Sequence, residues 1–323
     1  MSSEVFLRLL AIFSVIAVGW GAGKTRTLGG EDTARIVSNL AFFVFVPALL
    51  FRTTSEIDLA KLPWITLAAF FVPVVGLLLV VYVWQRTRGD LPPAGPSVRA
   101  ISTTYGNLVQ LGIPIAATVF GAAGLAIHVA IVSLHAITLL TILTVLVELD
   151  VARAQAQVHG GGTALATTLA VTTRRTVLHP VVTPVLVGLA WNLFGLPVPR
   201  TIDNALATLS AAVVPVCLVA IGLSLQAYGV RGAARAAVAL SAGKLLVQPA
   251  LVFAAAHWAA GLHGEPLAVV VMAAALPSGS NALLFAQRYH TLEGEATAAI
   301  VISTVAFVVT APFWLWLVSQ LAP

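Results

Sequence analysis

Apolar runs of about 20 residues recur along the whole chain, and short polar connections separate them. A helix needs roughly 20 apolar residues to cross the hydrocarbon core of a bilayer. Of the 323 residues, 59% are hydrophobic and 9% are charged, whereas about a quarter of the residues of a soluble domain are charged. So few charged side chains cannot cover a water-exposed surface. The sequence therefore predicts an all-α integral membrane protein with the lipid bilayer as its solvent.

Ten segments are long and apolar enough to be predicted as transmembrane helices: 5–21, 34–52, 63–84, 99–121, 123–148, 176–195, 202–225, 235–260, 266–288 and 295–320. The longest polar connection, 150–175, divides them into five and five. We therefore predict a first five-helix repeat at 1–149 and a second at 176–323. Because five is odd, the second repeat enters the membrane in the opposite orientation, as in inverted-repeat transporters.

Basic residues predict the orientation, because Lys and Arg concentrate on cytoplasmic connections. With the N-terminus outside, the inward connections carry Lys24, Arg26, Arg35, Arg86, Arg88, Arg99, Arg153, Arg174, Arg175, Arg231, Arg235 and Arg288. The outward side carries only Arg8, Arg52, Lys61 and Arg200. We predict a multi-pass protein of the plasma membrane with both termini extracytoplasmic. The formal charge of +5 is explained by this placement, so no nucleic-acid partner is expected.

The fourth helix of each half contains glycine, proline and asparagine at membrane depth. The first reads Tyr105-Gly106-Asn107-Leu108-Val109-Gln110-Leu111-Gly112-Ile113-Pro114, and the second reads Leu276-Pro277-Ser278-Gly279-Ser280-Asn281. Proline removes a backbone donor, and the freed polar groups cannot face lipid. Two interrupted helices at matching positions of two halves predict a transporter binding site. The alternative is a pair of kinked helices that satisfy each other across an interface.

The chemistry of these breaks favours an anion. Opened helix N-termini present N–H donors and a positive dipole end, which suit a carboxylate, and no Asp or Glu lies in the middle of a predicted helix. The serines could instead bond a carbonyl of the preceding turn. The candidate substrate-binding residues are Asn107, Gln110, Pro114, Pro277, Ser278, Ser280 and Asn281.

Lys244 is the only charged residue in the interior of a predicted helix, and Gln248 follows four residues later on the same face. A central Lys costs about 2.5–3.5 kcal/mol on insertion scales, so it is functional by default. We predict a fixed cation near the breaks, in place of a coupling sodium ion. Two alternatives stay open: a Lys that reaches the inner interface, and a Lys that exchanges a proton.

Three stretches resemble the auxin efflux carrier family: Phe45–Phe51, Tyr105–Asn107 with Leu111–Pro114, and Leu276–Asn281 with Ala286–Tyr289. The resemblance implies a scaffold of helices 1, 2, 6 and 7 and a transport domain of helices 3–5 and 8–10. It also implies that helices 4 and 9 cross at their prolines, that transport follows an elevator mechanism, and that a homodimer forms through helices 2 and 7. Asn107 and Asn281 match the family's crossover asparagines, which contact an anionic substrate. The chain lacks the long central hydrophilic loop of the plant carriers and is similar to the compact bacterial members.

The leading hypothesis is a secondary transporter or facilitator for a small organic anion, either an auxin-like carboxylate or a dicarboxylate. A sodium- or proton-coupled carrier of the same crossed-helix architecture, similar to a bile-acid symporter, is the alternative. A serine hydrolase at Ser278-Gly279-Ser280 would need a His base, and no spacing supplies one, so we expect no enzyme. His128 and His135, seven residues apart, lack zinc-ligand spacing and are expected to be packed and hydrogen-bonded. The single Cys217 leaves no multi-cysteine metal site, and no cofactor is expected.

The predicted topology can be tested in the connection 150–175. Cysteines introduced there should react with an impermeant thiol reagent only from the cytoplasmic side, because the basic residues place this connection inside. Labelling would be compared in intact cells and inverted vesicles. Reaction from outside intact cells contradicts the orientation and the five-plus-five arrangement.

Overall fold

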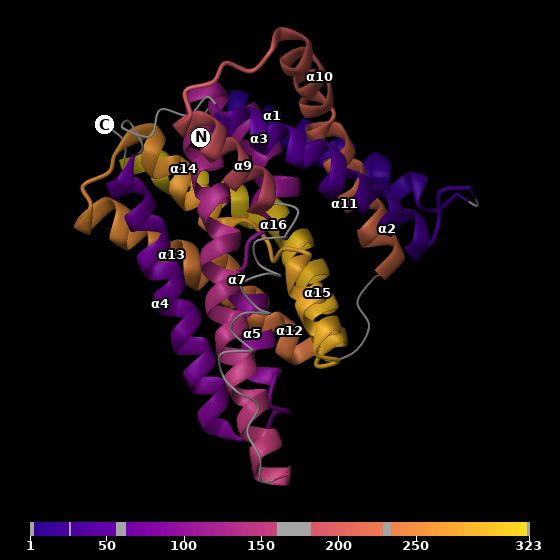
Figure 1. Ribbon diagram of the computed structural model, residues 1–323, viewed down its shortest axis with the longest axis vertical. Coiled ribbons are helices and arrows are strands. Elements are labelled where there is room, and N and C mark those ends of the chain that lie inside the picture. The colour runs from indigo at the N-terminus through magenta and orange to yellow at the C-terminus, as the bar shows by residue number, and fades with distance from the viewer. Residues whose placement is uncertain (1–2, 26, 56–62, 160–181, 229–233, 322–323) are drawn as a thin grey trace.

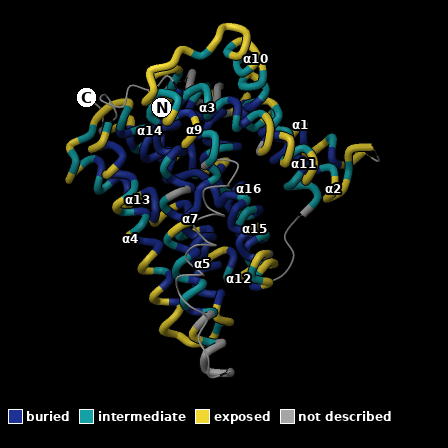
Figure 2. The backbone as a smooth tube through the Cα atoms, viewed as in Figure 1, coloured by how far each residue is buried: buried dark blue, intermediate teal, exposed yellow. Residues whose placement is uncertain are grey.

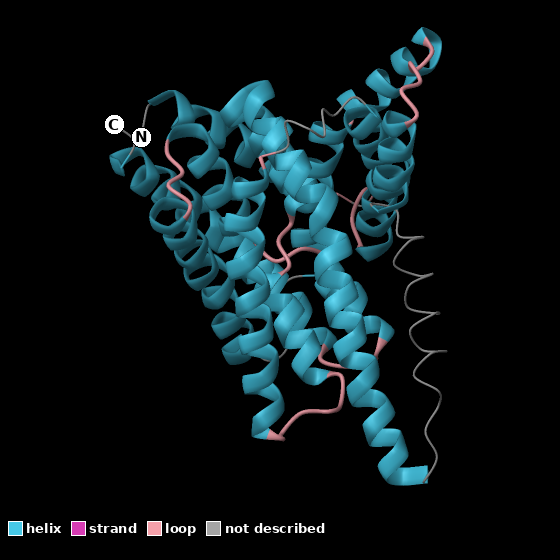
Figure 3. Ribbon diagram, turned by 60° about the vertical axis from the view of Figure 1, so that its left-hand side comes forward, coloured by secondary structure: helices cyan, strands magenta, loops and turns pink. Residues whose placement is uncertain are grey.

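The computed structural model describes residues 3–25, 27–55, 63–159, 182–228 and 234–321. No strand occurs among these residues, and their one isolated β-bridge joins Gly106 to Ser278. The prediction of an all-α protein is confirmed (Figures 1 and 3). Most of the predicted connection 150–175 lies outside the described residues. Its first part differs from the prediction, because helix α7 continues through His159.

The helices, with π-helical segments labelled η, follow one another in two halves. The first half contains α1 (Ser3–Ala22), α2 (Glu31–Leu40), η1 (Ala41–Phe45), α3 (Val46–Ser55), α4 (Trp64–Arg88), α5 (Gly95–Thr104), η3 (Leu108–Gly112), α6 (Ile113–Ile115), η4 (Ala116–Phe120) and α7 (Gly121–His159). The second half contains α9 (Val182–Leu193), α10 (Arg200–Ala211), α11 (Val213–Tyr228), α12 (Ala234–Ala242), η5 (Gly243–Val247), α13 (Gln248–Ala254), η6 (Ala255–Ala259), α14 (Gly264–Ala275), α15 (Asn281–Arg288) and α16 (Glu293–Leu321).

Six helical stretches among the described residues are long and apolar enough to cross a membrane: Glu31–Ser55, Trp64–Arg88, Leu108–Val151, Arg200–Ala227, Ala234–Ala259 and Glu293–Gln320. Three shorter apolar helices are Leu10–Ala22, Thr183–Leu193 and Gly264–Ala275. A multi-pass membrane protein follows, whereas the number of ten spans stays a prediction. The longest stretch includes Gly121, whose φ of 68° lets the chain turn so that α7 packs back against η4.

The helices that lead into the two breaks lie in the protein core. Every residue of α5 except Arg99 is buried, and α14 is buried from Val269 to Ala275. By contrast, large apolar side chains of α4 are exposed, including Trp64, Val72 and Val80. Figure 2 shows this division between a buried centre and exposed outer faces. The outer apolar faces fit contact with lipid, and the breaks are shielded from it.

The helices pack in two groups. In one, α1 and α2 pack against α11, and α3 packs against α9 and α10. In the other, α4 packs against α5, α13 against α14, and α16 against α12 and α14. Figure 1 shows α1, α2, α10 and α11 on one side of the helices α4, α5, α7 and α12.

Glycines allow the closest approaches within the first group. A Cβ at Gly19 in α1 would lie 2.5 Å from the carbonyl oxygen of Val219 in α11, and a Cβ at Gly222 would overlap the carbonyl oxygen of Ile16. A Cβ at Gly188 in α9 would lie 2.8 Å from the carbonyl oxygen of Phe51 in α3. Small residues that let helix backbones approach are typical of membrane helix interfaces.

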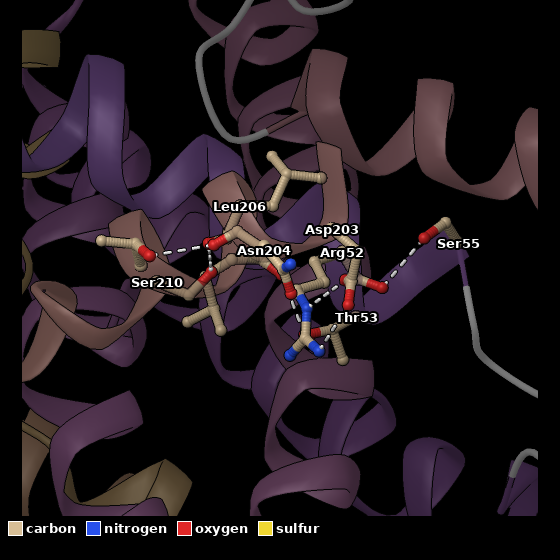
Figure 4. Close-up of polar contacts among 9 residues, drawn as sticks. Arg52, Thr53, Ser55, Asp203, Asn204, Leu206 and Ser210 are labelled. Atoms are coloured by element: carbon tan, nitrogen blue, oxygen red, sulfur yellow. Dashed lines mark hydrogen bonds and ion pairs between the residues drawn. The ribbon is translucent and has the colours of Figure 1, made fainter. Parts of the chain in front are cut away.

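Ion pairs join the ends of neighbouring helices. Arg52 of α3 donates to Asp203 of α10 from Nε at 2.6 Å and from Nη2 at 3.3 Å (Figure 4). Arg99 of α5 donates to both carboxylate oxygens of Glu295 of α16 at 2.9 Å, and to Oε1 of Gln85 of α4 at 2.9 Å. Two-point contacts of this kind fix geometry as well as charge. Each ion pair therefore holds together helices of one packing group.

The close approach of α1 and α11 predicts opposite effects for two glycine substitutions. Gly222→Ala should destabilise the protein by about 1–3 kcal/mol, because its Cβ has no room. Gly76→Ala in α4, where a Cβ meets nothing within 4 Å, should leave stability unchanged or raise it, because Ala is the better helix former. Thermal unfolding of the purified proteins measures both. Equal melting temperatures of the two variants would contradict the tight packing of α1 against α11.

Candidate functional site

The two helix breaks cross each other in the protein core. The N–H of Asn107 donates to the carbonyl of Pro277 at 2.8 Å, and the N–H of Gly279 donates to the carbonyl of Tyr105 at 2.9 Å. These bonds satisfy backbone groups that the interrupted helices leave free. Residues 105–107 and 276–281 therefore form one unit, called the crossing below. The alternative of two kinked helices that bond to each other accounts for these backbone hydrogen bonds. It does not account for the polar side chains that surround them.

The crossing lies at a proline in only one of the two helices. Pro277 contributes its carbonyl to the crossing, but Pro114 lies in α6, beyond the crossing segment. The structure thus differs from the prediction that both helices cross at their prolines. The reason is the space available: a Cβ on Gly279 would lie only 3.0 Å from the carbonyl oxygen of Gly106, so the backbones meet glycine against glycine.

The polar side chains of the crossing bond to the protein itself, and one of them caps a helix. Asn107 caps η3, where its Oδ1 accepts the N–H of Gln110 at 3.2 Å. Asn281 begins α15, and its Nδ2 donates to the Tyr105 hydroxyl at 2.8 Å. Ser278 donates from Oγ to the carbonyl of Ser102 at 2.6 Å, which links α5 to the second break. Ser278 and Asn281 are therefore engaged with the protein itself.

Lys244 and Gln248 bind the ends of the helices that stop at the crossing. Lys244 is completely buried, and its Nζ donates to the carbonyl of Ala274 at 2.6 Å. Gln248 Nε2 donates to the carbonyl of Thr104 at 3.2 Å. Helix C-termini carry free carbonyls and partial negative charge, which a cation and an amide donor both satisfy. In this structure Lys244 points to the crossing and does not reach an interface.

A proline shapes the helix segment that carries Lys244. Pro249 has no N–H, so the carbonyl of Leu245, four residues earlier, lacks its helical partner. Trp314 of α16 donates from Nε1 to this carbonyl at 2.8 Å. Lys244 and Leu245 lie in the π-helical segment η5, and such segments are frequent at functional sites.

A cavity of about 350 Å³ lies beside the crossing, between the two packing groups. One wall is a helical stripe of Arg35, Ser38, Asn39 and Phe43 from α2 and η1; a second comes from α11, and the opposite wall from α15 and α16. Of the predicted site residues, Asn107, Gln110 and Ser280 line this cavity. The other predicted residues are not among its lining: Pro114, Pro277, Ser278, Asn281, Lys244 and Gln248.

The polar residues of α2 in the cavity wall are not among the residues predicted for the site. Arg35 is the only charged side chain among the described residues that line the cavity, and it pairs with Asp32 at 2.7 Å. Arg35, Ser38 and Asn39 occupy positions i, i+3 and i+4, which share one face of a helix. This spacing, at the start of a predicted membrane helix, is the feature of the sequence that indicates a polar helix face.

A second, much smaller hollow of about 20 Å³ adjoins the crossing, lined in part by Tyr105, Asn107, Ser280, Asn281 and His135 of α7. Asn107 and Ser280 line both spaces. Among the described residues, no cluster of three or more His, Cys, Asp or Glu could hold a metal ion. What the site offers is amide and hydroxyl groups at two helix N-termini.

Comparison with known proteins agrees with this architecture. The family model of the membrane transport proteins matches residues 4–315. An uncharacterised transporter of Methanothermobacter thermautotrophicus is 26% identical over 312 residues, covering 95% of this chain and 96% of the relative. A putative malonate transporter of Rhizobium meliloti is 23% identical, covering 98% and 96%. Auxin efflux carrier component 8 of Arabidopsis thaliana is 26% identical, covering 76% and 78%. The chain therefore belongs to the membrane transport protein family, to which the auxin efflux carriers belong, and is a membrane transporter.

Proposed function

We propose that this transporter carries a small organic anion, which binds at the end of the cavity formed by the crossing. The observation that carries the proposal is the lining of that end. Asn107 caps η3, Ser280 directly precedes α15, and Gln110 lies in the first turn of η3. Helix N-termini attract anions through N–H donors and the helix dipole. None of the described residues that line the cavity is acidic.

The relatives support an organic anion. One is named for malonate, a dicarboxylate, and others for auxin. Apolar side chains also line the cavity, including Phe43, Leu225 and Leu284. An anion with a short apolar body would bury that body against these walls. Carboxylates of this kind are therefore the substrates to screen first.

The two packing groups support an elevator mechanism. The cavity has α2, η1 and α11 on one side and the crossing, α15 and α16 on the other. Movement of the second group along the first would carry the crossing and its substrate across the membrane. In this proposal the scaffold is the group of α1–α3 and α9–α11, which correspond to predicted helices 1, 2, 6 and 7. The homodimer through helices 2 and 7 stays a prediction.

Two glycine contacts support inverted repeats. Gly19 approaches Val219, and Gly188 approaches Phe51. The glycines are 169 residues apart and their partners 168 apart, so the same contact recurs with the halves exchanged. A repeated contact of this kind is expected if the two halves share one fold and meet about a pseudo-twofold axis.

We further propose that transport does not require sodium. Sodium, like other hard cations, is bound by oxygen ligands, and Lys244 occupies the carbonyl of Ala274 at the end of α14. A sodium ion 4 Å from the ammonium group would be repelled by roughly 4 kcal/mol at an effective dielectric of 20. Among the described residues, Lys244 has no acidic partner. Because no acidic group in the described part of the chain stabilises the charge of the buried Lys244, proton exchange by Lys244 is the second candidate for coupling.

The asparagines of the crossing provide the first test of the carrier proposal. Asn107→Ala and Asn281→Ala should each abolish binding of malonate and indole-3-acetate, because Asn107 lines the cavity and Asn281 holds Tyr105 in place. The measurement is the ligand-induced thermal shift of the purified protein. Asn204→Ala, at an exposed position of α10, is the matched control. Normal binding by either crossing variant shows that its asparagine is structural.

The role of Lys244 is tested by ion replacement. Substrate affinity should be equal in sodium and choline buffers of matched ionic strength and pH. Lys244→Ala should weaken affinity, and Lys244→Arg should retain the charge with a disturbed fit. A tenfold tightening by sodium in the wild-type protein, about 1.4 kcal/mol of coupling, contradicts sodium independence. Affinity that changes with mildly alkaline pH, and not with sodium, supports proton exchange.

A further inference from the structure

The small hollow beside the crossing shares lining residues with the larger cavity. Its walls come from both breaks and from Val132, His135 and Ala136 of α7. Asn107 and Ser280 also line the large cavity, so the hollow adjoins the proposed substrate site. A volume of about 20 Å³ holds one water molecule or one oxygen-sized group, provided that polar partners surround it.

Two buried histidines of α7 differ in how they are satisfied. His128 and His135 are each 2% exposed. The Nε2 of His128 lies 2.8 Å from the carbonyl oxygen of Leu108, as expected for a structural histidine. The Nε2 of His135 has no hydrogen-bond partner among the described residues. Buried polar atoms are nearly always paired, so His135 departs from the structural role that the sequence predicted for both.

Aromatic rings hold the His135 side chain in place. The Tyr105 ring packs edge-on with its centroid 4.4 Å from the imidazole centroid, and the Phe70 ring lies at 6.2 Å. The Tyr105 hydroxyl is itself bound to Asn281. The imidazole is therefore fixed against the crossing before any ligand arrives, which lowers the entropic cost of binding.

We propose that His135 is a substrate-binding residue, which hydrogen-bonds one oxygen of the anion when that oxygen enters the hollow. The inference rests on the proposed carrier function, and it adds a contact from α7, a helix whose described residues do not line the large cavity. A neutral imidazole donates one hydrogen bond, which matches an anionic oxygen. Because α7 packs against α5 and α14, His135 keeps this contact while the crossing moves.

Three variants of the full-length protein test the inference. His135→Phe keeps a flat ring and removes both nitrogens, whereas His135→Gln restores a hydrogen-bonding group. Ser133→Ala is the control, because Ser133 lies on the same helix and its Oγ bonds only the carbonyl of Val129. Melting temperature is measured without ligand and with increasing malonate or indole-3-acetate.

We expect His135→Phe to melt at or above the wild-type temperature without ligand, because an unpaired nitrogen is removed. Its affinity for the bound probe should fall about tenfold or more, the effect of losing one hydrogen bond to a charged group. His135→Gln should recover part of that loss, and Ser133→Ala should behave as wild type.

The contrary outcomes separate this inference from the carrier proposal. Wild-type affinity in His135→Phe overturns the inference alone, as does loss of its folded state, which would make the imidazole structural. Absence of any shift in the wild-type protein with both probes overturns the anion-carrier proposal and the His135 contact with it.

Discussion

Two backbone hydrogen bonds between the helix breaks hold the centre of this protein together. A helix that stops inside a membrane leaves N–H and C=O groups without partners, and each unpaired group costs several kcal/mol in hydrocarbon. The bonds from Asn107 to Pro277 and from Gly279 to Tyr105 remove part of that cost by pairing one break with the other. Neither break is satisfied in this way without its counterpart. The crossing is therefore a property of both halves of the chain together.

The crossing also separates the positive ends of helices from the negative ends. The helices that begin there, η3 and α15, present their N-terminal ends and the side chains of Asn107 and Ser280 to cavities. The helices that end there, α5 and α14, present carbonyls that Gln248 and Lys244 bind. Positive helix ends thus face the space where an anion is proposed to bind, whereas the negative end of α14 meets the buried Lys244 and that of α5 meets the amide of Gln248. This separation is the electrostatic basis of the proposed selectivity, because a bound cation would meet the helix dipoles with the wrong sign.

Close packing makes each of the two helix groups a rigid unit. Gly19, Gly188 and Gly222 bring α1, α3, α9 and α11 into close contact, and the ion pair of Arg52 with Asp203 ties α3 to α10. The other group has its own ties, including Arg99 with Glu295. Strong contacts inside each group and a cavity between them are what a rigid-body movement requires. Arg35 lines the cavity between the two groups, and His135 lines the small hollow beside the crossing.

The sequence by itself determined the solvent and the positions of the breaks. Low charge and long apolar runs require lipid, and Gly, Pro and Asn at membrane depth require an interruption, because these effects act over a few neighbouring residues. It also singled out Asn107, Gln110 and Ser280, which line the cavity, and Lys244, which the structure places at a helix end. Only the tertiary structure decided that the first interrupted helix crosses at Gly106 and not at Pro114. The crossing point depends on how closely the backbone of the second interrupted helix approaches, at Gly279. The same holds for the place of Arg35 in the cavity wall and for the unpaired Nε2 of His135. Cavities and missing partners are made by helices distant in the sequence, and the local pattern shows only that Arg35, Ser38 and Asn39 share one face of a helix.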